Sequence, residues 1–555
     1  MSLTPAEFVQ AHARAHSLSV LRRALTEPSD DSGLLRSLRA NVVEQACLDP
    51  AFRTWAAEMS LSGSPPDPRT ALRIITSARG ANGGANILPV TKSLKSIVGP
   101  RLESQLVADP EVVGAAWMTV EYLLGRLSLH RLIPVVQAVD LIAGLHGPRG
   151  EIRSLSSLQF PGFAAIGVEN PPLILAEQAV HESAHVTLAA RIALDTNLMP
   201  LTDERVGILS PFTNSVRTIE RVSHGILSYA AVRHLWRAVA LEVNPEFWME
   251  LQDREKACDL VARRLRTLDA RLALAMICLF DAAGIEVCNL LVDLAADLLE
   301  TELDHPTKLV SRRREVVTAA GYPVKPAGLG AIQRAELGAA TRGDKVSRVT
   351  LPFADISKDG FALVSSLAVV ASSWVIRSVP DPRIGQFSNI SGDVAHVLDA
   401  DSGSEVHLYL HRDPALAREA AILDMDDQAG ELLGIPTCCR EWFLREWPAA
   451  RQAGGDAFAV MINQAASGGT VIVASECDAS AMYRGGGLCW HFPCSPSCPE
   501  TIRIVRERRE RLMRSDPSLL MELETAYRYT VTIREDGTYV DHATSEHNAV
   551  IVHFK

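Results

Sequence analysis

The chain carries little basic charge and few aromatic side chains. Of its 555 residues, 55 are Lys or Arg and 66 are Asp or Glu, which gives a formal charge of −11, and aromatic residues make up 5%. Proteins whose main function is to bind nucleic acid usually have an excess of basic residues, so the negative net charge argues against a nucleic-acid-binding protein. We expect no nucleic-acid partner.

The sequence also lacks a long apolar run and a secretory signal. The N-terminal residues Met1 to Glu7 contain no basic stretch followed by an apolar one. The longest apolar run, residues 361–375, is interrupted by serines and falls short of the roughly 20 residues that span a bilayer. We therefore expect a cytoplasmic protein without a membrane partner, whose ten cysteines are thiols or metal ligands.

Several common catalytic motifs are missing as well. The chain contains no Walker A loop, no G-x-G-x-x-G and no G-x-S-x-G motif. Its motifs therefore support neither a nucleotide-binding protein nor a serine hydrolase. Apolar residues nevertheless make up 47% of the chain, which is an ordinary globular composition.

The pattern predicts two modules, a mainly α-helical N-terminal metal-binding module and an α+β, Cys-rich C-terminal module. Six of the ten cysteines crowd between positions 438 and 498. We place the first module at 1–320, a Gly- and Pro-rich linker at 321–345 and the second module at 346–555. Helical spacing of apolar residues marks 35–60, 92–145, 171–194, 214–242 and 250–303, and an extended stretch at 159–168 precedes the third of these. In the second module we expect strands at 348–353, 362–376, 404–410, 470–475, 528–534 and 549–554, and helices at 414–432, 439–448, 500–512 and 517–526.

One motif in the first module carries recognisable chemistry. Residues 180–186 read VHESAHV, which matches H-E-x-x-H in an apolar helix. Residues four apart lie on one face of a helix, so His181 and His185 can bind one ion. Glu182 lies on a neighbouring face, where it can reach metal-bound water. Burying these three polar side chains without a partner would be costly.

A second predicted helix offers the third ligand. Glu220 and His224 are four residues apart and share a face. Glu220 would complete the 2-His-1-carboxylate set of zinc peptidases and non-haem iron oxygenases, whereas His224 would complete a three-imidazole set. Spacing alone leaves both open.

These elements resemble a known family, the H-E-x-x-H proteins described as 2-oxoglutarate-dependent peptide β-hydroxylases of ribosomally made peptide natural products. The resemblance covers the Pro161-Gly162 segment, the helix with the paired histidines, Arg217, and His224-Gly225, whereas the family's Arg-Pro-Leu reads Arg-Thr-Ile at 217–219. It implies Fe(II) and 2-oxoglutarate as cofactors, a precursor peptide as substrate, and His224 as the third ligand.

The co-substrate's distal carboxylate would need a cation, for which Arg is suited because it binds carboxylates through two hydrogen bonds. Arg217 and Arg221 are the candidates, with Arg191 as a further one, and a surface ion pair is the competing interpretation for each. Two other functions stay open: a zinc peptidase with Glu182 as general base, and a binding scaffold whose metal sites are only structural.

The Cys-rich module predicts a second metal site. Cys438 and Cys439 follow a Gly-Ile-Pro-Thr segment, and His491, Cys494 and Cys498 lie within a Pro-rich segment. Thiolates at this spacing can bind a zinc ion or an iron–sulfur cluster. We expect at most four ligands, since adjacent cysteines rarely bind one ion, and we assign Cys477 and Cys489 to the core. The competing interpretation is a set of buried thiols.

Overall fold

The structure is a computed structural model of the whole chain. It describes residues 4–24, 43, 46–62, 70–71, 74, 86–88, 94–95, 102–147, 154–157, 160–242, 254–377, 393–397, 400, 404–424, 428–452, 457–465, 470–527, 529–533, 539–543 and 549–554. Predictions for the first part of segment 35–60 and for Leu158 and Gln159 lie outside these residues.

The described residues group into two compact units, and their boundaries differ from the predicted modules. The first unit comprises 1–202, 223–272 and 287–305, and the second comprises 203–222, 273–286 and 306–555. Residues 203–222, 273–286 and 306–320, which the sequence pattern places in the first module, thus group with the second unit. The boundaries between the two units fall inside three helices, where the helical periodicity of the sequence continues without a break, so the sequence pattern does not indicate them.

The first unit is built around a long buried helix. Its elements are α1 (Pro5–Ala24), α4 (Pro50–Ser62), β1 (Asn86–Ile87), α7 (Pro110–Arg126), α8 (Leu132–Gln137), β2 (Leu141–Leu145), β3 (Ser154–Ser156), β4 (Phe163–Gly167) and α9 (Pro172–Leu194), with parts of α10 (Ile219–Leu241), α12 (Arg254–Ala283) and α13 (Ile285–Leu299). Helix α9 packs against α1, α7, α8, β3 and β4. Residues are buried on most of its sides, because neighbours surround it.

This unit, predicted as mainly helical, also contains a small mixed sheet. The strand order is β1-β2-β4-β3, with β1, β2 and β4 parallel and β3 antiparallel to β4. Strands β2 and β4 are buried along their whole length, as parallel strands usually are. Strand β4 confirms the predicted extended stretch, whereas β2 lies within the predicted helical segment 92–145. A short apolar run does not distinguish a buried strand from a buried helix.

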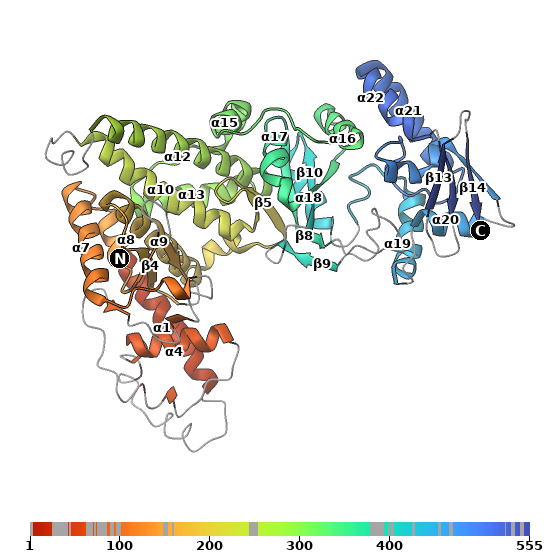
Figure 1. Cartoon of the computed structure of the whole chain (residues 1–555). Coiled ribbons are helices and arrows are strands. Elements are labelled where there is room, and N and C mark those ends of the chain that lie inside the picture. Colours follow the sequence, from red (N-terminus) through yellow and green to blue (C-terminus); the bar gives the residue numbers. More distant parts are fainter. Residues whose placement is uncertain are drawn as a thin grey trace. The chain divides into compact units, whose positions relative to one another are not determined.

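The second unit contains a larger sheet with helices beside it (Figure 1). Strands β5 (Val206–Ser210), β6 (Ser215–Arg217), β7 (Ser347–Pro352), β8 (Ala368–Arg377), β9 (Asp393–His396) and β10 (Ser404–His411) form the order β6-β5-β8-β10-β7, with β9 beside β8. The helices are α14 (Pro306–Ser311), α15 (Arg313–Ala319), α16 (Ala331–Arg342), α17 (Phe361–Leu363) and α18 (Pro414–Leu423). Helix α16 lies within the predicted linker 321–345 and packs against β7.

The C-terminal part of this unit contains both helices and strands, which is compatible with the predicted α+β module. It comprises α19 (Thr437–Gln452), α20 (Ala457–Ala465), β11 (Thr470–Ala474), α21 (Pro499–Ser515), α22 (Pro517–Glu524), β12 (Tyr529–Ile533), β13 (Tyr539–Ala543) and β14 (Ala549–Phe554). The four strands form a sheet in the order β11-β14-β12-β13 (Figure 1). Two predictions were too long: 362–376 begins with α17, and 414–432 is helical only to Leu423. In the part of the chain that the structure describes, no helix is both long and apolar enough to cross a membrane.

Candidate metal centres

Helix α9 presents the H-E-x-x-H motif inside the first unit. Pro172 occupies its first turn, where the missing amide hydrogen costs nothing. Gln178 anchors the helix to the sheet, because its side-chain oxygen accepts a hydrogen bond from the Gly167 amide at 3.0 Å. His181 and His185, one turn apart, consequently project from a helix that is fixed on several sides.

Helix α10 brings His224 to the same place. The Nδ1 atoms of His185 and His224 lie 3.2 Å apart, and the Nε2 atoms of His185 and His181 lie 3.1 Å apart. The rings of His181 and His185 meet edge to face at 4.7 Å, and those of His185 and His224 stack at 5.3 Å. The three predicted metal ligands therefore form one imidazole group.

The surroundings of His185 favour its neutral form. Burial holds the pKa of His185 well below its usual range, and the neighbouring His181 and His224 add to the effect. Neutral imidazole is the metal-binding form of histidine. In the observed orientation, His185 faces its neighbours with opposite ring nitrogens. A shared ion would take one nitrogen from each ring, whereas His185 here gives a different nitrogen to each neighbour.

Glu182 is held away from bulk water by a residue that the sequence analysis missed. The Ser154 hydroxyl, on β3, donates a hydrogen bond to the Glu182 carboxylate at 2.6 Å, and Glu182 is only 5% exposed. Ser154 lies 28 residues before Glu182, so no local sequence pattern predicts this contact. Tyr229, also missed, packs its ring edge to face on His181 at 4.8 Å, and burial raises its pKa.

A buried carboxylate one turn before His181 ties three helices together. Glu177 accepts a hydrogen bond from the Trp236 indole at 2.7 Å and forms an ion pair with Arg264. These contacts link α9 to α10 and α12. Because a buried charge is stable only when it is paired and hydrogen-bonded, the network fixes the two helices that supply the imidazoles.

The other predicted residues of the first site have different surroundings. Glu220 lies one turn before His224 and is half-buried, and its pKa is raised by burial and by nearby Glu204. Arg217 is half-buried on β6, and burial lowers its pKa, as does Arg221.

Arg217 also donates a hydrogen bond to the Thr213 hydroxyl at 3.3 Å, and Arg221 is exposed. Arg191 lies over the Phe8 ring at 4.2 Å and 3.6 Å from Asp297, which favours the structural interpretation of that arginine.

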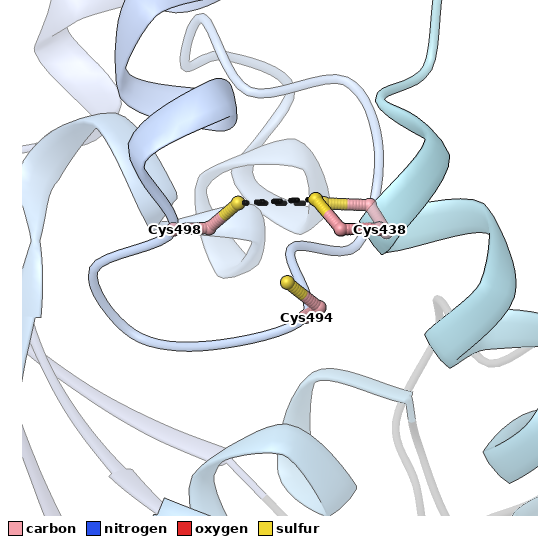
Figure 2. A group of neighbouring side chains, drawn as sticks. Cys438, Cys494 and Cys498 are labelled. Carbon is pink, nitrogen blue, oxygen red and sulfur yellow. Dashed lines mark hydrogen bonds between the residues drawn. The ribbon is translucent and has the colours of Figure 1, made fainter.

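Four cysteines form the second group. Cys438, Cys439, Cys494 and Cys498 hold their sulfur atoms within 4.8 Å of one another, so they could hold a metal ion. Figure 2 shows Cys438 at the start of α19 facing Cys494 and Cys498 on the loop before α21. Both adjacent cysteines belong to the group, although adjacent cysteines rarely bind one ion.

The thiols of this group differ in their readiness to ionise. Burial opposes ionisation of Cys498, yet hydrogen bonds from Thr501 and from neighbouring thiols lower its pKa to about 7. Burial raises the pKa of Cys439 and raises that of Cys494 to about 12. Four such thiols give up their protons together only beside a cation.

His491 is not a member of the cysteine group, which corrects its predicted role. Its Nε2 lies 3.0 Å from the Thr501 hydroxyl, and Thr501 in turn contacts the Cys439 sulfur at 3.4 Å. Burial lowers the pKa of His491 to about 3, with Arg508 and Lys345 adding to the effect. His491 also lines a cavity of about 280 Å³. It therefore contacts the cysteine group only through Thr501, while Cys477 and Cys489 are buried as predicted.

No protein-family model matches this chain, and a search of curated proteins returns no match. The assignment of both centres consequently depends on their residues and geometry.

Proposed function

We propose that the chain is an Fe(II)- and 2-oxoglutarate-dependent oxygenase that hydroxylates the β-carbon of a residue in a ribosomally made precursor peptide. The observation that supports it is the imidazole group, in which His181 and His185 from α9 meet the buried His224 from α10. Three protein ligands leave coordination positions open for a co-substrate and oxygen. The resemblance around Pro161-Gly162 and His224-Gly225 supplies the choice of reaction.

The chain's own residues would prepare and shield the site. Burial keeps His185 neutral, so the protein does not need to remove a proton from it before a cation binds. The Tyr229 ring covers one side of His181, and the Glu177 network holds α9 against α10. A bound iron would supply the oxidation, with 2-oxoglutarate as the co-substrate that is consumed. Arg217 and Arg221 are the proposed partners of its distal carboxylate.

A zinc peptidase is the second candidate, and one contact bears on it. The Glu182 carboxylate would have to activate a water as general base, yet it is buried and accepts the Ser154 hydroxyl. This contact leaves one oxygen of Glu182 for a water. The binding-scaffold interpretation, by contrast, requires a closed site with four protein ligands.

The decisive experiment needs no peptide. The full chain is purified without oxygen and loaded with Fe(II), and 2-oxoglutarate is then added while the visible spectrum is recorded. We expect a metal-to-ligand charge-transfer band that disappears in His181→Ala, His185→Ala and His224→Ala. On admission of air, succinate should form from 2-oxoglutarate in the wild type only.

Glu220→Gln is the matched control, since it changes a polar residue one turn from His224 on the same helix. The band should survive this change. If the band survives His224→Ala and fails in Glu220→Gln, the third ligand is Glu220. A chain that shows no band, retains zinc and cleaves peptides until Glu182 becomes Gln would be a peptidase, and the oxygenase proposal would be wrong.

A further inference from the structure

The cysteine group has the dimensions of a single coordination tetrahedron. The sulfur of Cys438 lies 3.9 Å from that of Cys439 and 3.8 Å from that of Cys498, and the Cys439 and Cys498 sulfurs are 3.7 Å apart. A tetrahedron with zinc–sulfur bonds of about 2.3 Å has sulfur–sulfur edges of about 3.8 Å. The measured edges agree with this value to within a tenth of an ångström.

An iron–sulfur cluster requires a wider arrangement. In a [4Fe–4S] cluster each cysteine binds a different iron, and in a [2Fe–2S] cluster the cysteines are divided between two irons. Their sulfurs are then held further apart than around one ion. Every sulfur pair in this group, including those with Cys494, is within 4.8 Å, so the group is sized for one ion.

Separate anchors hold the ligand segments in this arrangement. The amide of Cys439 donates to the Pro436 carbonyl at 3.0 Å, which begins α19, and the amide of Cys498 donates to the Ser495 carbonyl at 3.3 Å, which closes the loop. The amide of Ala474, on β11, donates to the Pro496 carbonyl at 3.0 Å. The loop between Cys494 and Cys498 is therefore fixed to the sheet as well as to α21.

The position of the group indicates a structural role. Cys439 and Cys498 are fully buried in a core that contains Trp442, Phe458 and Val473. Four protein sulfurs leave no position for substrate or water, as in closed structural zinc sites. An ion here would join α19 to the 494–498 loop, which lies far from α19 in the chain and leads directly into α21.

We propose that Cys438, Cys439, Cys494 and Cys498 bind one zinc ion in a closed tetrahedral site that holds the C-terminal part of the second unit together. The neighbouring Thr501 hydroxyl, 3.4 Å from the Cys439 sulfur, supports the thiolate, and His491 orients Thr501. This site is separate from the imidazole group and does not depend on the function proposed for it.

The test measures the metal and its ligands in the full chain. The chain carrying His181→Ala is used, so that the imidazole group does not contribute metal. We expect about one equivalent of zinc per chain, an X-ray absorption spectrum with four sulfur neighbours at about 2.3 Å, and thiolate-to-cobalt charge-transfer bands after exchange with Co(II). The same chain should show neither the visible absorption of iron nor acid-labile sulfide.

Substitution of single cysteines distinguishes the proposed zinc ligands from cysteines outside the site. Cys438→Ser changes the exposed member of the group and should lower the zinc content at least tenfold, whereas Cys477→Ala and Cys489→Ala change buried cysteines outside it and should leave the zinc content unchanged. Acid-labile sulfide, a mononuclear iron, or a zinc spectrum with nitrogen or oxygen neighbours would each overturn the proposal. Because the spectra come from the parent chain, a variant that fails to fold does not decide the outcome.

Discussion

The ion pair between Asp281 and Arg313 should be essential to the second unit. The guanidinium of Arg313 donates to both carboxylate oxygens of Asp281, at 2.6 and 2.7 Å, and to the Leu367 carbonyl at 2.7 Å. Asp281 is fully buried and Arg313 is 9% exposed. The amide of Val369 also donates to Asp281, at 3.3 Å. The pair thus joins α12 and α15 to the start of β8.

Arg313→Met removes the guanidinium but keeps an apolar chain of similar length. It leaves the Asp281 carboxylate in the core with only a long hydrogen bond from Val369. Loss of one member of a buried pair costs about 3–5 kcal/mol of unfolding free energy, because the remaining charge is uncompensated. In the double variant Arg313→Met, Asp281→Leu no buried charge remains, so we expect a smaller loss than in Arg313→Met alone.

Arg312→Met is the matched control, because the neighbouring Arg312 side chain is 70% exposed and pairs with Glu315 on the surface. Exposed pairs contribute less than about 1 kcal/mol. A chain with two compact units can unfold in more than one step, so urea unfolding should be followed by hydrogen exchange of peptides from 273–286 and 306–320. Equal losses in the two single variants, or a double variant as unstable as Arg313→Met, would refute this reasoning.

Two further predictions concern the first unit. Gly162 has φ +79°, and a Cβ there would lie 2.3 Å from Asp140 and 2.5 Å from Arg53. Gly162→Ala should therefore lower the free energy of unfolding by more than about 1 kcal/mol in a thermal melt. Gly125→Ala in α7 is the control, because a Cβ there meets nothing within 4 Å, and it should be neutral or stabilising. Burial lowers the pKa of His12 to about 4, so below about pH 6.5 this side chain binds a proton more readily in the unfolded chain. Its own contribution to the loss of stability between pH 6.5 and 4 should be at most about 3 kcal/mol. His12→Gln should flatten this pH dependence in unfolding titrations, and an unchanged slope would contradict the assignment.

The secondary structure of the second module was largely readable from its sequence. Strands β7, β10, β11, β12 and β14 and helices α19, α21 and α22 agree with the predicted segments to within a few residues. These strands are rich in Val, Ile and Tyr, and several helices begin with proline in the first turn, so local preference and the final fold agree. The predicted linker is a place where local preference and the final fold disagree. A Gly- and Pro-rich segment precedes α16, yet Ala335 and Ala339 of this helix are buried, so tertiary packing determines its structure.

The sequence predicted those candidate site residues that lie close together in one segment of the chain. His181 and His185 follow from helical spacing, and the choice of His224 came from the resemblance rather than from spacing. Ser154, Tyr229 and Trp236 make their contacts through tertiary packing between segments distant in sequence, which no local pattern encodes. The division of the chain was missed for the same reason, since long helices run through it.

The two candidate centres differ in how closely the fold brings their donor atoms together. The sulfurs of Cys438, Cys439 and Cys498 are spaced like three corners of one tetrahedron, and that of Cys494 lies within 4.8 Å of each. In the imidazole group, His185 presents one ring nitrogen to His181 and the other to His224. Closed sites whose ligands are fixed by several segments serve stability, whereas three ligands and open positions suit chemistry at the metal. We therefore propose a structural centre in the second unit and a reactive one in the first.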